Sequence, residues 1–204
     1  ALPEVAVLPG RAGLSLETGM ADNFVIKFYT PVTEASIGTL MRTVDQKLAA
    51  GATHFTVLIS TSGGSVFHGL TAYNYLKGIP AQVTTHNIGS VDSIGVALYC
   101  AGQTRISVPQ ARFLMHPVSM NFREAASYEE PKLMELVKSL RVDMENCASV
   151  IAANTRQSKK QVLRAMLARQ TLDPDTALDW GLVHEIRQEL FPEGTEVIPI
   201  QTGG

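Results

Sequence analysis

The chain has 204 residues, of which 45% are hydrophobic and 18% are charged, so it can form one well-buried globular domain and is not a disordered chain. Its 17 Lys and Arg and 19 Asp and Glu give a net charge of −2. No block of like charge offers the basic surface that nucleic-acid binding needs.

The longest apolar run, residues 94–102, is too short to span a bilayer. The first twenty residues lack a basic start followed by an apolar core, so no secretory signal is expected. The two cysteines argue against a disulfide framework and a cysteine-rich zinc site, and a cytosolic setting is expected.

The hydrophobic pattern alternates between strand-like and helix-like segments from residue 24 onward. Strands are expected at Val25–Tyr29, His54–Ser60 and Gln82–Asn87, and helices at Thr33–Ala50, Ser65–Lys77 and Ser93–Ala101. Arg105–Val108 and Arg112–His116 are expected to form a short strand pair around Pro109. Strand–helix–strand repetition with short turns predicts a mostly parallel α/β core.

The alternation of strand and helix patterns ends after His116. Residues 117–128 are polar and irregular, and Glu129–Asn154 has the spacing of a long amphipathic helix. Two shorter helices are expected at Ser158–Leu167 and Asp173–Trp180, and strands at Val183–Ile186 and Val197–Ile200. Without a repeat or linker, residues 1–204 are interpreted as one domain, with an irregular N-terminal segment at 1–23 and a projecting region at 117–155. The long helix has more apolar positions than a lone solvated helix needs, namely Leu133, Leu136, Val137, Leu140, Val142 and Met144. These residues alone support packing on the chain's own core and packing on another subunit about equally.

Ser93 is a candidate nucleophile. It lies in the segment GSVDSIG, residues 89–95, where a strand is expected to turn into a helix. Unpaired N–H groups at a helix start lower the cost of negative charge developing there. The segment is not the hydrolase elbow G-x-S-x-G, because Val91 occupies the first glycine position. The ordinary alternative is that Ser90, Asp92 or Ser93 caps the helix, which is the commoner role of a serine at a helix start.

A second segment, TSGGS at residues 61–65, could supply backbone donors. Paired glycines after a buried strand permit positive φ and bring N–H groups close to a bound carbonyl or anion. The alternative is an ordinary strand-to-helix turn with Ser65 as the cap. No phosphate-binding glycine motif is present in this segment.

A general base for Ser93 would be one of five histidines. His54 and His184 lie at or near strand ends and are interpreted as structural or surface residues. The pattern leaves His68, His86 and His116 nearly tied. No H-x-x-x-H or H-E-x-x-H spacing supports a metal, and neither a metal nor a cofactor is expected.

In their order, these motifs resemble the proteolytic subunit of the Clp serine proteases. The segments are SGGS at residues 62–65, G-x-x-x-S-x-G at 89–95 and an apolar strand that ends in MHP at 115–117. Gly64 and Ser93 are 29 positions apart, and Ser93 and His116 are 23 apart, a gap shortened by a turn deletion around residues 103–104. The similarity runs from Val25 to His184 and includes ALDWGLV at 177–183. It implies an α/β ClpP/crotonase-like fold, a superhelical spiral of repeated β-β-α units with a projecting long helix.

The resemblance also assigns roles to individual residues. Ser93 would be the nucleophile, His116 the general base, and the backbone N–H groups of Gly64 and Ile94 the oxyanion hole. The implied activity is that of a serine endopeptidase that hydrolyses peptides or unfolded proteins through an acyl-enzyme on Ser93. The implied partners are other copies of the chain, in heptameric rings stacked in pairs, and an ATPase unfoldase. Neither nucleic acid nor a membrane is expected as a partner.

The chain departs from the family's pattern at the position of the triad acid. Residues 169–171 read RQT, without a carboxylate. Asp173 comes three or four residues late and looks like the N-cap of the last helix. Three possibilities stay open: Asp173 reaches the site, Gln170 orients His116 through its amide oxygen, or the pair works without a third member.

Other departures keep alternative functions open. Asp92 and Ser62 are unusual beside the nucleophile and in the glycine loop, and residues 1–23 do not match the loops with which the family meets its ATPase, which argues against that partner. The missing triad acid favours one alternative, a non-catalytic or weakly active ClpP-like subunit of a mixed ring. Another is a crotonase-type acyl-thioester enzyme, which uses backbone N–H donors but needs no Ser-His pair.

Overall fold

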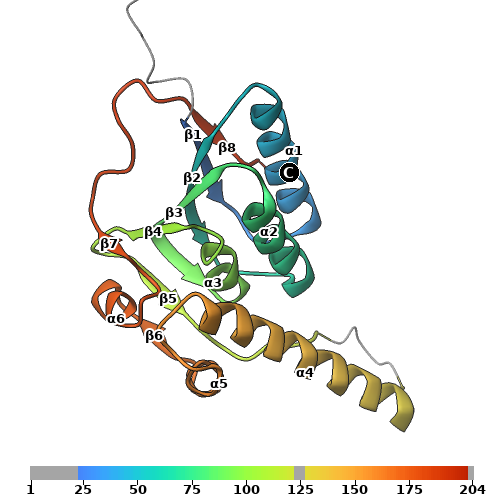
Figure 1. Cartoon of the computed structure of the whole chain (residues 1–204). Coiled ribbons are helices and arrows are strands. Elements are labelled where there is room, and N and C mark those ends of the chain that lie inside the picture. The colour runs from blue at the N-terminus through green and yellow to red at the C-terminus, as the bar shows by residue number, and fades with distance from the viewer. Residues whose placement is uncertain (1–22, 122–126, 202–204) are drawn as a thin grey trace, which may run out of the picture.

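The computed structural model describes residues 23–121 and 127–201, which form a mixed sheet with helices packed against it (Figure 1). Most of the N-terminal segment expected to be irregular, residues 1–22, lies outside the described residues, as do residues 122–126. The strands are β1 (Asn23–Tyr29), β2 (His54–Thr61), β3 (Gln82–Asp92), β4 (Thr104–Ser107), β5 (Arg112–Leu114), β6 (Thr171–Leu172), β7 (Glu185–Ile186) and β8 (Val197–Pro199). The helices are α1 (Glu34–Ala49), α2 (Val66–Gly78), α3 (Ile94–Tyr99), α4 (Glu130–Ala153), α5 (Lys159–Leu167) and α6 (Pro174–Asp179). None of these helices is both long and apolar enough to cross a membrane.

The centre of the sheet is parallel, as the sequence predicts. Strands β1, β2 and β3 lie side by side in chain order, and β8 adds to the outer edge of β1. Six of the eight residues of β2 are fully or nearly fully buried, because this strand lies between β1 and β3 and helices α1 and α2 pack against the sheet (Figure 1). A buried parallel strand reads as a continuous apolar run, which is why this strand is recognisable in the sequence.

Strand β3 is longer than expected and has two successive partners along one edge. Residues 84–87 pair with β4, and residues 90–92 pair with β5, both in parallel. The expected pairing of these two short strands with each other is therefore wrong. Both run in the same direction as β3, and parallel neighbours need a long crossover, whereas only residues 108–111 connect them. The two short strands therefore follow one another along the same edge of β3.

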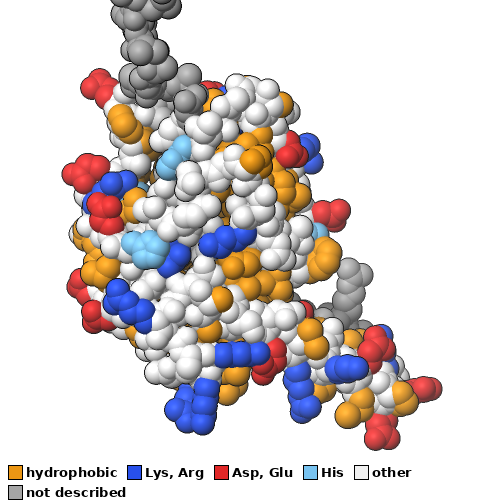
Figure 2. Space-filling view, in the orientation of Figure 1, with side chains coloured by type: hydrophobic (Ala, Val, Ile, Leu, Met, Phe, Trp, Pro, Cys, Tyr) orange, Lys and Arg blue, Asp and Glu red, His pale blue; other side chains and the backbone are white. Residues whose placement is uncertain are grey.

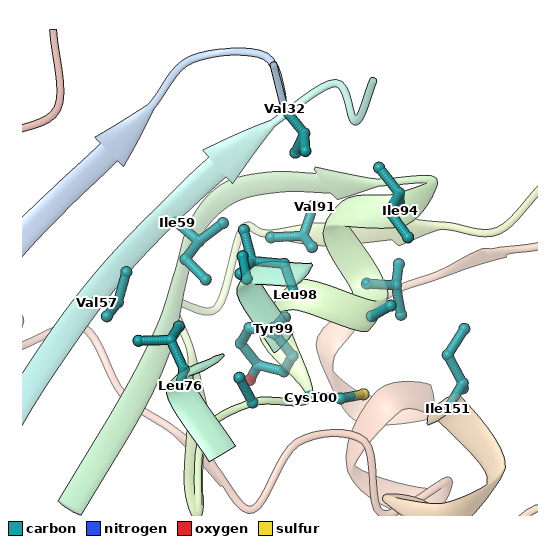
Figure 3. Close-up of a cluster of buried hydrophobic side chains, with 14 of the residues drawn as sticks. Val32, Val57, Ile59, Leu76, Val91, Ile94, Leu98, Tyr99, Cys100 and Ile151 are labelled. Carbon is teal, nitrogen blue, oxygen red and sulfur yellow. The ribbon is translucent and has the colours of Figure 1, made fainter. Parts of the chain in front are cut away.

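The main hydrophobic core lies between the sheet and helices α1, α2 and α3 (Figure 3). Val57 and Ile59 from β2, Leu76 from α2 and Leu98 from α3 are completely buried there. Every residue of the short helix α3 is buried. The Tyr99 hydroxyl, at the end of this helix, donates to the Ile106 carbonyl at 2.8 Å, which satisfies the one polar group that the ring brings into the core. The helix that follows Ser93 is thus rigidly embedded.

Arg105 connects the C-terminal helices to the sheet. Its side chain is buried and donates to carbonyl oxygens at four places, Gly102, Asn154, Gly181 and Leu182. His184 packs against the same guanidinium, at 2.8 Å, and its pKa is lowered by burial and by the charge of Arg105. This contact makes His184 a structural residue, in line with the expectation from the sequence. A buried arginine is tolerated here because carbonyl oxygens satisfy its donors.

Helix α4 projects from the body of the molecule (Figure 1). Only its C-terminal part is anchored, through the buried residues Cys147, Ala148 and Ile151. On the projecting part the apolar residues Leu133, Met134, Val137 and Val142 are exposed, among charged side chains (Figure 2). Packing of the whole helix on the chain's own core, one of the two readings of the sequence, is therefore wrong for this part.

Candidate active site

Ser93 occupies the junction between β3 and α3 in a strained conformation. Its φ of 60° and ψ of −128° lie in a region that residues other than glycine rarely adopt, at a cost of about 1–3 kcal/mol. Its N–H donates to the Leu114 carbonyl at 2.7 Å, which holds the turn against β5. The Ser93 side chain makes no capping hydrogen bond to α3. Asp92 and Ser90 bond to each other instead of to the helix, so the capping alternative for this segment is wrong.

The Gly63-Gly64 turn packs directly against Ser93. A Cβ at position 63 would lie 2.6 Å from the Cβ of Ser93, and one at position 64 would lie 2.2 Å from the Val32 carbonyl oxygen. Both glycines also have positive φ, 85° and 149°. Only glycine therefore allows this loop to approach Ser93 and Val32 so closely.

Two backbone N–H groups flank the serine. Ile94 is the first residue of α3, so its N–H has no acceptor within the helix. The Gly64 N–H lies between two loop hydrogen bonds, Val32 N–H to Gly63 O and Ser65 N–H to Val32 O. In the part of the chain that the structure describes, neither Gly64 nor Ile94 donates its N–H to another protein group. Preorganised donors of this kind can stabilise an oxyanion.

His116 and Ser93 line the same partly enclosed cavity. The other two histidines left open by the sequence do not line it. His68 lies on the first turn of α2, and its N–H is bonded to the Ser65 cap. His86 is completely buried in β3, and burial, with a smaller contribution from the charge of Arg187, lowers its pKa to about 4. Cavity placement therefore favours His116 as the base.

The imidazole of His116 is held by a neutral backbone group. Its Nδ1 lies 2.8 Å from the Pro117 carbonyl oxygen. Because a carbonyl can only accept, Nδ1 carries the proton and Nε2 is the free, basic nitrogen. Among the described residues, no hydrogen bond joins His116 to the Ser93 hydroxyl, and no carboxylate forms an ion pair with His116.

Among the described residues, neither candidate for the triad acid forms a hydrogen bond with the His116 ring. Asp173 is the N-cap of α6, and its exposed carboxylate accepts the Thr176 N–H at 2.8 Å. This hydrogen bond lowers the pKa of Asp173. Gln170 uses its backbone, whose carbonyl accepts the Met115 N–H at 2.9 Å and whose N–H donates to Ala165. The Gln170 contact anchors the strand end before His116 rather than its imidazole ring.

Asp173→Asn is expected to leave peptide turnover unchanged and to shift the thermal unfolding midpoint by no more than about 2 °C, because asparagine caps helices as well as aspartate. Asp173→Ala, the matched variant, should unfold at a lower temperature since it loses the cap. Turnover and thermal unfolding measured on the same preparations separate a cap from a catalytic acid. If Asp173→Asn keeps its fold but loses most of its turnover, Asp173 acts as the triad acid and is not only a helix cap.

The remaining cavity wall is apolar and comes from distant parts of the chain. It is completed by Val66, Ile94, Ala97, Met115, Val118, Cys147, Ile151 and Met166. The sequence motifs did not indicate that α4 and α5 contribute to this wall. The one available signal was the spacing of Cys147 and Ile151, which places them on one helix face. Burial, and then the charge of Asp143, raises the pKa of Cys147 to about 12, so this thiol is neutral and is not a competing nucleophile.

Comparisons with known proteins agree with this architecture. The family model of the Clp protease matches residues 16–189. An ATP-dependent Clp protease proteolytic subunit from Deinococcus radiodurans is 29% identical over 130 residues, which cover 63% of this chain and 62% of that protein, so the match spans less than two thirds of the relative's length. Among solved structures, a mutant of ClpP1 from Listeria monocytogenes aligns with a TM-score of 0.73 at 22% identity, over 81% of this chain and 91% of that chain. The ClpP-like α/β fold implied by the resemblance is thereby confirmed.

Proposed function

The chain belongs to the Clp protease family, and from this premise we propose that it is a single-domain serine endopeptidase acting on peptides or unfolded proteins. The observation that carries the proposal is the convergence of Ser93 and His116 on one cavity beside two unpaired N–H groups. A nucleophile, a base and oxyanion donors are the parts that acyl transfer requires.

In the proposed reaction, the Ser93 hydroxyl oxygen attacks the scissile carbonyl while His116 Nε2 takes the hydroxyl proton. The N–H groups of Gly64 and Ile94 hold the oxyanion of the tetrahedral intermediate. The C–N bond then breaks, the amine leaves with the proton from Nε2, and an acyl-enzyme ester remains on Ser93. Water, deprotonated by His116, attacks this ester through a second tetrahedral intermediate and releases the acid product and the serine.

The hydrogen-bond partner of His116, the Pro117 carbonyl, is neutral, and we expect this to lower the rate. The Pro117 carbonyl fixes the same tautomer that an acid would, so Nε2 can act as the base. It carries no full negative charge, however, and stabilises the imidazolium less than a carboxylate. This observation supports a second candidate, a weakly active or non-catalytic subunit of a mixed ring. A crotonase-type enzyme is the weaker alternative, because it would leave the shared placement of Ser93 and His116 without a role.

Turnover assays with the purified full chain separate these functions. Fluorogenic peptides of different sequence and an acyl-thioester serve as parallel substrates. We expect hydrolysis of peptides, abolished in Ser93→Ala and retained in the control Ser149→Ala, an exposed serine on α4. Thioester turnover that survives Ser93→Ala would support the crotonase reading. An assembled protein that turns over neither substrate would support the non-catalytic subunit.

We also propose that the chain assembles into heptameric rings stacked in pairs. The exposed apolar residues of α4 support this, together with a mainly apolar groove along that helix, which is lined by Pro117, Val118, Val137, Leu140, Met144 and Leu167 and also by Arg141 and Glu145. An ATPase unfoldase is not part of the proposal, because the sequence of residues 1–23 does not match that of the loops with which the family meets its ATPase. Both cysteines are free and buried, which suits a reducing compartment, and we place the protein in the cytoplasm.

Light scattering at micromolar concentration is expected to give roughly 310 kDa, the mass of two rings of seven 22.0 kDa chains. Val137→Glu should lower this mass, because it buries a charge in any contact that covers the α4 surface. Lys138→Glu, a neighbouring exposed position, is the control and should assemble normally. A monomer of the unaltered chain under these conditions would remove the assembly proposal.

A further inference from the structure

Three side chains next to the nucleophile form a closed hydrogen-bonded cluster. The Ser90 hydroxyl donates to the Asp92 carboxylate at 2.6 Å, and the Arg112 guanidinium donates to both partners, to Ser90 Oγ at 2.8 Å and to Asp92 at 3.3 Å. We call this cluster, Ser90, Asp92 and Arg112, the clasp. Asp92 directly precedes Ser93, and Arg112 lies four residues before His116.

The clasp joins the two strands that deliver the nucleophile and the base. Ser90 lies opposite Arg112, and Asp92 opposite Leu114, in the parallel ladder between β3 and β5. The backbone of Arg112 is tied to β3 as well, since its carbonyl accepts from the Asn87 side-chain amide at 2.8 Å. Residues of β3 thus hold both the backbone and the side chain of Arg112.

Strand β5 needs such support because its own ladder is short. It has three residues, and its other neighbour, β6, has two. Three side-chain hydrogen bonds join β3 to β5, from Asn87 to the Arg112 carbonyl and from the Arg112 guanidinium to Ser90 and Asp92. They add to the few backbone bonds, although the Arg112 side chain is 55% exposed and its ion pair with Asp92 is therefore weak in energy. The Ser93 N–H depends on the same alignment, because its acceptor is the carbonyl of Leu114 at the end of β5.

The clasp does not face the cavity that contains Ser93 and His116. Ser90 and Asp92 instead line a second cavity, at the carboxyl ends of β1, β2 and β3, with Tyr29, Thr30, Pro31, Ser60, Thr61 and Ser62. The two cavities share no lining residue. Any influence of the clasp on a substrate in the first cavity must therefore pass through the backbone of β3 and β5.

We propose that the clasp residues Ser90, Asp92 and Arg112 are positioning residues, which set Ser93 against His116 by locking the register of β5 on β3. The inference rests on the proposed peptidase function for its consequence, but the locking itself is a property of the fold. A serine and a histidine that exchange a proton must be aligned closely, and small displacements reduce the rate strongly. The planar fork of arginine allows one side chain to reach both partners, which lysine cannot reproduce.

Arg112→Lys is the first test, since it keeps the charge and loses the fork. We expect kcat to fall by about tenfold and KM to change by less than about twofold, because the cavity wall is untouched. Ser90→Ala should show the same pattern, and Ser90→Thr, which restores the hydroxyl, should recover most of the loss. Lys47→Gln, which breaks the remote exposed ion pair with Glu196, is the control and should leave kcat unchanged. Equal activity of Ser90→Ala and Ser90→Thr would overturn the proposal.

Amide hydrogen exchange tests the locking without any turnover. In Arg112→Lys, the Ser93 N–H should exchange at least about threefold faster than in the unaltered chain, while amides in the β1–β2 ladder keep their rates. If the exchange rate of the Ser93 N–H is unchanged in Arg112→Lys, the clasp does not lock β5 on β3, whatever the peptide turnover of the variant. A protein that hydrolyses no substrate but shows faster exchange at Ser93 would remove the peptidase proposal and leave the locking role established.

Discussion

Replacing Ser93 with alanine is expected to lower kcat for peptide hydrolysis by about 10³-fold or more, since in the proposed reaction the Ser93 hydroxyl forms the acyl-enzyme. The fold should remain intact. Among the described residues the Ser93 side chain makes no hydrogen bond, and alanine keeps the Cβ that packs against Gly63. Stability and assembly should therefore match those of the unaltered chain.

Peptide turnover, thermal unfolding and light scattering on the same preparations test this expectation. Ser149→Ala controls for the loss of an exposed serine and should retain full turnover. If Ser93→Ala stays assembled and hydrolyses peptides at more than a tenth of the original rate, Ser93 is not the nucleophile.

Replacing His116 with glutamine is expected to have an effect of similar size, a loss of about 10³-fold in kcat. Glutamine can fill the space and donate a hydrogen bond to the Pro117 carbonyl, but its amide cannot accept and return a proton near neutral pH. KM should change much less than kcat, because the apolar wall of the cavity is preserved.

The matched control is His68→Gln. His68 is half-buried and lies four residues after Gly64 in the sequence, yet it does not line the cavity. We expect this variant to keep its turnover. Equal losses in the two histidine variants would show that placement in the cavity does not identify the base.

Much of the fold is predictable from local pattern because its main elements carry their own boundaries. Thr33, Ser65 and Ser158 cap the helices expected there, and the carboxylate of Asp173 caps α6. The sequence-based predictions are wrong or incomplete where the pairing of strands decides the structure. Strand β6 has two residues, too few for a period to show. The separate partners of β3 follow from sheet geometry rather than from the residues around Pro109.

The site divides in the same way. Gly64, Ser93 and His116 stand out as ordered motifs, and the resemblance singles out His116 among the three open histidines. The Pro117 carbonyl at the imidazole was not predictable, because any residue offers a backbone carbonyl and only the tertiary structure brings one into place. The clasp was missed for a related reason. Ser90 and Asp92 read locally as helix caps, and their true partner, Arg112, lies in another strand.

The central claim, that Ser93 is an activated nucleophile, is tested most directly by its reaction with a fluorophosphonate. The assembled full chain would be treated with the probe and digested, and the modified residue located by mass spectrometry. We predict one adduct per chain, on Ser93, which is lost in Ser93→Ala and strongly slowed in His116→Gln. An assembled protein that hydrolyses peptides and yet carries no adduct on Ser93, or carries it on another residue, would contradict the account.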